Sequence, residues 1–367
     1  MAEQLAKKHR REPLFHIAKR DAMVWWKSWL VRGIAVLAAL IVAAVVTVLL
    51  TGANPIGVYT SLFRGAFGTP RRIWRLLQGM AILLCIALAL TPAFKMKFWN
   101  CGGEGQVLVG GLASAACMLL LGEHLPYPVL IGVIVVASIL AGAVWGVIPA
   151  IFKAYYNTNE TLFTLMMNYV AMQIVAYFVY VNAVPKGSGQ IQSIDFGHLP
   201  IVGGQRYLLN ILIVAALTVM MFIYLKYSKQ GYEIAVVGES QNTARYIGIN
   251  VKKVIIRTML ISGALCGLAG MLLVAGTDHT ITKETAGGQG FTAIMVSWLA
   301  KFNPIYMVLT TFLIVFLGRG AEQIATDFGL NGSYADILTG IIIFFIVGSE
   351  FFIQYAVKFR GGQKEAN

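Results

Sequence analysis

The sequence predicts an all-α fold, a polytopic transmembrane helical bundle with about ten membrane segments. Of its 367 residues, 58% are hydrophobic and 12% are charged, and the mean hydropathy is +0.72. An ordinary soluble domain carries about 25% charged residues, because its surface must be solvated. Here the hydrophobic residues gather in runs that approach the ~20 residues needed to cross a bilayer. Composition therefore excludes a soluble enzyme.

The apolar runs define the expected membrane segments. Runs of spanning length lie at 31–52, 73–92, 127–150, 160–183, 206–227, 254–276 and 334–357. Shorter or glycine-interrupted runs lie at 107–121, 289–302 and 305–325, and runs under about 17 residues can be re-entrant instead. We expect a basic cytoplasmic arm at 1–30, a single transmembrane domain at 31–357 and a cytoplasmic tail at 358–367.

Basic residues between the runs predict the topology, because cytoplasmic loops are enriched in Lys and Arg. With the N-terminus inside, Lys95, Lys153, the 226–257 cluster and the C-terminus all lie in the cytoplasm. One loop disagrees, and it contains Arg64, Arg71, Arg72 and Arg75. Either it forms an interfacial helix or the first two spans are misdrawn. The net charge of +13 is spread over many loops, which disfavours nucleic-acid binding.

Two glycine-rich breaks resemble one another. Residues 102–106 (GGEGQ) open one short apolar run, and residues 287–291 (GGQGF) open another. Short, glycine-interrupted segments at matching places in two halves indicate inverted repeats around a central substrate path. With 38 glycines in the chain, chance similarity is the alternative.

Polar side chains at these breaks and inside spans are candidates for lining that path, because polar groups are costly in lipid and usually face a bundle interior. The candidates are Asn100, Glu104, Gln106, Asn168 and Gln289. The competing interpretation is structural. Asn168 can hydrogen-bond two helices together, and Glu104 or Gln289 can cap the start of a helix.

The loop at 227–253 is the longest polar interruption of the hydrophobic chain. Within it, Ser240 is a suitable N-cap for a short helix to Tyr246, and Gly248 is a suitable stop. Such a helix, exposing Tyr246 and Ile249, can dock in a partner's groove. A solvated loop whose charges only set topology is the alternative.

Motifs for catalysis or metal binding are absent from the sequence. The five histidines lie singly, the four cysteines show no CxxC spacing, and neither GxxxxGK[ST] nor GxSxG occurs. We therefore expect no enzymatic activity, no metal site and no bound cofactor in this chain.

Several motifs together resemble a known family. They are Gly231-Tyr232-Glu233 with Val236-Val237-Gly238, Ala244-Arg245-Tyr246 with Gly248-Ile249, Ser262 to Gly270, Asn100 to Gly110, Thr158 to Val170, and Gly290 to Pro304. In this order they resemble the permease subunits of bacterial ABC importers for ribose and branched-chain amino acids, with the simple-sugar and nucleoside branch most similar. Cys101, Gly103, Trp298 and Lys301 depart from the family's usual residues.

The resemblance implies one half of a translocation pathway for nucleosides or simple sugars in a bacterial inner membrane. The implied partners are an ATPase subunit that binds ATP and Mg²⁺, a second permease subunit forming a heterodimer, and an extracellular binding lipoprotein or periplasmic protein. The residues implied to couple to the ATPase are Gly231, Glu233, Gly238, Ala244, Arg245, Tyr246, Gly248 and Ile249. The alternative is a stand-alone ion-coupled transporter, which predicts acids embedded in the membrane. Glu104, Glu322 and Glu350 instead lie near segment ends.

Overall fold

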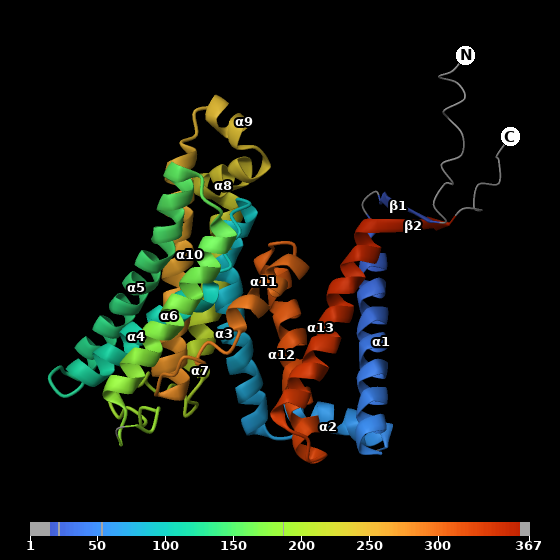
Figure 1. Ribbon diagram of the computed structural model, residues 1–367, viewed down its shortest axis with the longest axis horizontal. Coiled ribbons are helices and arrows are strands. Elements are labelled where there is room, and N and C mark those ends of the chain that lie inside the picture. The colour runs from blue at the N-terminus through green and yellow to red at the C-terminus, as the bar shows by residue number, and fades with distance from the viewer. Residues whose placement is uncertain (1–14, 21–22, 53, 186, 360–367) are drawn as a thin grey trace. The chain divides into compact units, whose positions relative to one another are not determined.

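The computed structural model describes residues 15–20, 23–52, 54–185 and 187–359 (Figure 1). Most of the N-terminal arm and nearly all of the expected tail therefore lie outside the described residues. The described residues form two compact units, one from those within 1–65 and 317–367 and one from those within 66–316. Apart from a two-stranded pairing of β1 (Phe15–Lys19) with β2 (Tyr355–Phe359), the regular structure of the described residues is helical, which confirms the predicted fold class.

In the described residues, nine helices are long and apolar enough to cross a membrane. They are α1 (Trp25–Thr51), α3 (Pro70–Lys95), α4 (Gly103–Leu121), α5 (Tyr127–Tyr156), α6 (Glu160–Asn182), α7 (Leu208–Tyr227), α10 (Val251–Leu273) continued by the π-helical turn η1 (Val274–Asp278), α12 (Pro304–Asp327) and α13 (Gly332–Gln354).

The expected segment at 289–302 is the exception to the count. It forms α11 (Gln289–Leu299), whose 11 residues extend only about 16 Å, roughly half of a bilayer core. The predicted count of about ten segments thus corresponds to nine helices of spanning length in the described residues and this one of about half that length. The disputed arginine loop contains a separate short helix, α2 (Pro55–Phe67), and α3 already begins at Pro70.

The 66–316 unit is organised around α10, which packs against α3, α4 and α5. Close approach of these backbones requires glycine at the contact. A Cβ at Gly267 would lie 2.2 Å from the Ser138 carbonyl oxygen, and one at Gly270 would lie 2.1 Å from that of Val107. Small residues bring membrane helices close enough for van der Waals contact to hold them together. These contacts support the two sites that follow.

In the other unit, α1 packs against α13. The Arg32 guanidinium donates to the Glu350 carboxylate, and the Thr47 and Tyr334 hydroxyls form a buried hydrogen bond. Pairing two charges at such a helix contact keeps them off the lipid. Glu350 therefore has an internal partner within its unit.

Candidate functional site

Glu104 connects the two glycine-rich breaks. Its Oε1 accepts a hydrogen bond from the Gly288 amide at 2.7 Å, and its Oε2 accepts one from the Gly290 amide at 2.8 Å. These amides stand at the start of α11, where N–H groups have no partner within the helix. Glu104 itself lies in the first turn of α4 and is 3% exposed. An acidic side chain of one short helix thus caps the N-terminus of the other.

Asn100 and Gln106 form a second part of the same region. The amide of Asn100 donates to Gln106 Oε1 at 3.4 Å and to Ser262 Oγ at 3.2 Å, and Gln106 Nε2 donates back to Asn100 Oδ1 at 3.3 Å. Asn100 Oδ1 also accepts from the Gly102 amide at 3.0 Å. Both side chains are buried. The pair therefore ties the start of α4 to α10.

Asn168 attaches α6 to this network. Its Nδ2 donates to the Cys101 carbonyl oxygen at 2.9 Å, and its Oδ1 accepts from the Gly105 amide at 2.8 Å. The fifth candidate, Gln289, begins α11, and within the described residues its buried Oε1 has no hydrogen-bond partner. The structure thus brings all five candidates to the meeting point of α4 and α11. Four of them use their polar atoms inside the chain, and a role in lining a solute path stays a prediction.

The polar loop at 227–253 folds into two helices, α8 (Lys229–Glu239) and α9 (Gln241–Tyr246), at one end of the 66–316 unit (Figure 1). The sequence indicated α9 but not α8. Ser228 caps α8 by accepting from the Gly231 amide at 2.9 Å. Gly231 and Gly238 are required by close packing, because a Cβ would lie 2.5 Å from the Tyr224 carbonyl oxygen and 2.1 Å from that of Lys95, respectively.

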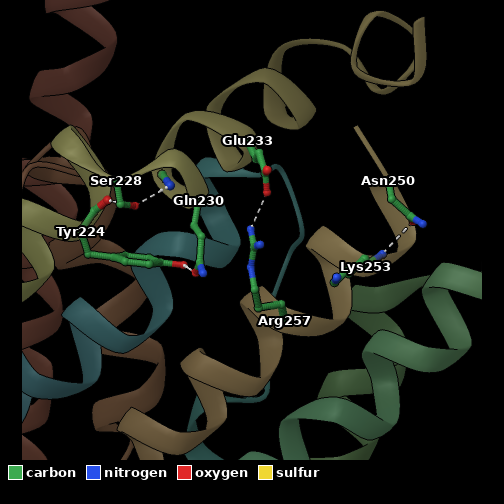
Figure 2. A network of polar contacts seen from close by, with 8 residues as sticks. Tyr224, Ser228, Gln230, Glu233, Asn250, Lys253 and Arg257 are labelled. Atoms are coloured by element: carbon green, nitrogen blue, oxygen red, sulfur yellow. Dashed lines mark hydrogen bonds and ion pairs between the residues drawn. The ribbon is translucent and has the colours of Figure 1, made fainter. Parts of the chain in front are cut away.

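Side-chain contacts hold α8 to its neighbours (Figure 2). Arg257 on α10 donates from Nη2 to Glu233 Oε2 at 2.9 Å, and both side chains are largely buried. The Tyr224 hydroxyl on α7 donates to Gln230 Oε1 at 3.1 Å. The structure pairs Glu233 within the chain, and its role in coupling to the ATPase stays a prediction. The Glu233–Arg257 ion pair links α8 to α10, the central helix of the 66–316 unit.

The short helix α9 has the predicted form. Ser240 Oγ accepts from the Thr243 amide at 3.2 Å, and Gly248 follows the helix with φ of 85°. Ala244 is fully buried, whereas Tyr246 is 93% exposed. Ile249 was expected to be exposed, but it is half-buried against the cluster under α8 and α10 because the chain turns back at Gly248. Arg245 and Tyr246 therefore both lie on the exposed surface of α9.

At the opposite end of the 66–316 unit, the 190–199 segment is bonded to η1 and the residue after it. The Ile194 amide donates to the His279 carbonyl oxygen at 2.8 Å, and the rings of His198 and His279 stack with centroids 3.7 Å apart. Burial, with His198 and Arg206 nearby, lowers the pKa of His279 to about 4. No local sequence pattern indicates this pair, because the two histidines are 81 positions apart in the chain.

A family model described as the branched-chain amino acid transport system/permease component matches residues 72–347. The chain belongs to this family. It is therefore a multi-pass membrane protein and an ABC importer permease, not an enzyme, and the ion-coupled alternative is set aside. The matched residues include both glycine-rich breaks and the α8–α9 region, which contain the motifs on which the resemblance was based.

Three curated relatives are similar over most of this permease. The guanosine ABC transporter permease protein NupP of Bacillus subtilis is 30% identical, over 91% of this chain and 96% of that protein. The glucose ABC transporter permease protein TsgB13 of Haloferax volcanii is 28% identical, over 90% of each. The nucleoside ABC transporter permease protein NupB of Lactococcus lactis is 29% identical, over 86% of this chain and 90% of that protein.

Proposed function

We propose that this permease is one of two transmembrane subunits of an importer for nucleosides, with simple sugars as the second candidate class. Two of the three relatives carry guanosine or nucleoside in their names, and the third carries glucose. Identity near 30% leaves both solute classes open. The proposed location is a bacterial inner membrane with both termini in the cytoplasm.

The proposal rests on the exposure of Tyr246 in the α8–α9 region. Tyr246 stands 93% exposed on a helix of six residues, while Ala244 on the same helix is completely buried. A large exposed aromatic on a firmly anchored helix is the pattern of a residue that inserts into a partner's pocket. We propose that this partner is the ATPase subunit, which binds ATP and Mg²⁺, and that α8–α9 transmits its movement to α10.

The other proposed partners are the remaining components of an ABC importer. A second permease subunit of different sequence completes the translocation path, and an extracellular binding lipoprotein or periplasmic protein delivers the solute. The candidates Asn100, Glu104, Gln106, Asn168 and Gln289 stay proposed contributors to the path through the α4–α11 meeting point. Among the other coupling candidates, the exposed Arg245 is a proposed contact of the ATPase. Gly231, Glu233, Gly238, Ala244, Gly248 and Ile249 are proposed to act in coupling by holding α8 and α9 in place.

Reconstitution tests the proposal. The permease, the ATPase, the second permease and the binding protein encoded beside it are placed in proteoliposomes, and ATP-dependent uptake of guanosine and of glucose is measured. We expect Tyr246→Ala to leave the complex assembled, to retain ATP hydrolysis and to reduce uptake at least tenfold. Tyr227→Ala, a change at another exposed tyrosine outside α9, is the matched control. Normal uptake by the assembled Tyr246→Ala complex would contradict the coupling role.

A further inference from the structure

The outer face of α6 differs from the outer faces of its neighbours. One side of α6, with Asn168 and Val175 at its centre, is buried against α4 and α5. The opposite side carries Tyr169, Gln173, Tyr177 and Tyr180, all exposed, which we call the α6 stripe. These residues recur at spacings of three and four, so they share one face of the helix. Gln173 lies near the middle of this membrane span.

The outer faces of α5 and α7 are aliphatic by comparison. Their large exposed residues at membrane depth include Val136, Leu140 and Val144 on α5 and Leu212, Val219 and Ile223 on α7. Such side chains are suited to lipid, whereas an amide near the bilayer centre has no water to replace its hydrogen bonds. Aromatic residues with polar tips belong at membrane interfaces rather than at the centre. The α6 stripe is therefore built to face something more polar than lipid.

A shallow groove of about 470 Å³, wide open to its surroundings and almost entirely apolar in its lining, lies on this face along Tyr169, Val170, Gln173, Ile174 and Tyr177. Tyr169 and Tyr177 lie one helical turn before and one turn after Gln173 in α6. Planar aromatic rings offer stacking surfaces, and a glutamine amide offers one donor and one acceptor to the edge of a heterocyclic base.

We propose that the α6 stripe lines the solute path and binds the flat ring of a nucleoside in transit. This inference rests on the proposed import function and assigns it a binding surface. Gln173 hydrogen-bonds the edge of the base, and the ring of Tyr169 or of Tyr177, each one helical turn from Gln173, stacks on one of its faces. A single helix supplies one wall only, so the second permease subunit supplies the opposite wall and the groove becomes a channel in the assembled pair.

Thiol labelling of the assembled importer tests whether water reaches the stripe. The four native cysteines are replaced by alanine, and Gln173→Cys is compared with Leu140→Cys, which lies at similar depth on the aliphatic face of α5. We expect a charged, membrane-impermeant thiosulfonate to modify the 173 position at least tenfold faster than the 140 position. Guanosine should slow that modification severalfold, and ribose should not. Equal rates at the two positions would overturn the proposal, and equal protection by ribose would overturn the assignment to a nucleobase.

Uptake kinetics supply a second test that needs no cysteine replacement. Gln173→Leu replaces the amide by an apolar side chain of similar size and removes its hydrogen bonds. We therefore expect the KM for guanosine uptake to rise about tenfold. ATP hydrolysis and complex assembly should stay within twofold of wild type. An unchanged KM in the Gln173→Leu complex would overturn the proposal. Absence of ATP-dependent guanosine and glucose uptake in the wild-type complex would instead contradict the proposed function itself.

Discussion

Replacing Gly290 by alanine tests the junction between α4 and α11 most directly. A Cβ at this position would lie 2.4 Å from the Glu104 amide nitrogen and 2.8 Å from its Cα. Both contacts are with backbone, so a rotamer change cannot relieve them. The start of α11 must move away from α4 by about 1 Å, since ordinary Cβ contacts begin near 3.4 Å. That movement lengthens the two hydrogen bonds that Glu104 accepts from Gly288 and Gly290.

The expected cost has two parts. Overpacking a close contact costs about 1–3 kcal/mol, and weakening two buried hydrogen bonds to a carboxylate adds about 1–3 kcal/mol. We therefore expect a loss of roughly 2–6 kcal/mol, measured as a lower midpoint of thermal unfolding in detergent. Gly132→Ala is the matched control, because Gly132 is also helical and has open space where a Cβ would lie. If the Gly290→Ala protein unfolds at the same temperature as the Gly132→Ala protein, the junction does not hold the two helices as described.

Three further predictions concern other contacts. Arg257→Ala should leave Glu233 without its partner and speed amide hydrogen exchange in α8 about tenfold, whereas Arg319→Ala should change exchange little, because its pair with Glu322 is exposed. Asn168→Leu should lower the unfolding midpoint, since the Gly105 amide and Cys101 carbonyl oxygen lose their partner, and an unchanged midpoint would contradict this role. The pKa of His279 is lowered to about 4 in the folded protein, so the unfolded chain binds the proton more tightly. The free energy of unfolding should therefore fall by at most about 3 kcal/mol as the pH drops from about 6.5 towards 4. The His279→Gln protein should lack this decline when its unfolding is measured over the same pH range.

Local sequence was sufficient for the elements whose causes are local. Most spans follow from hydropathy alone, and α9 follows from the Ser240 cap and the Gly248 stop, each acting within a few residues. The glycine-rich breaks were visible as interruptions of apolar runs. The contact between the two breaks could not be predicted, because a hydropathy pattern does not indicate which helix ends lie next to each other. The resemblance of motifs named the family before any contact was known.

Tertiary structure decided which polar groups meet. Glu104 and the Gly288 amide are 184 positions apart, and Glu233 and Arg257 are 24 apart, so no local pattern pairs them. Packing around α10 brings these groups together in an apolar interior. A polar group buried there without a hydrogen-bond partner would destabilise the fold, so each group needs its partner. The fold likewise distinguishes two faces of α6, the exposed α6 stripe and the buried face that contains Asn168. Both faces carry amides in a hydrophobic run, and only the fold shows which of them is already bonded and which is exposed. The sequence by itself determined a membrane permease with a long polar loop at 227–253, and the fold decided which polar residues hold the protein together.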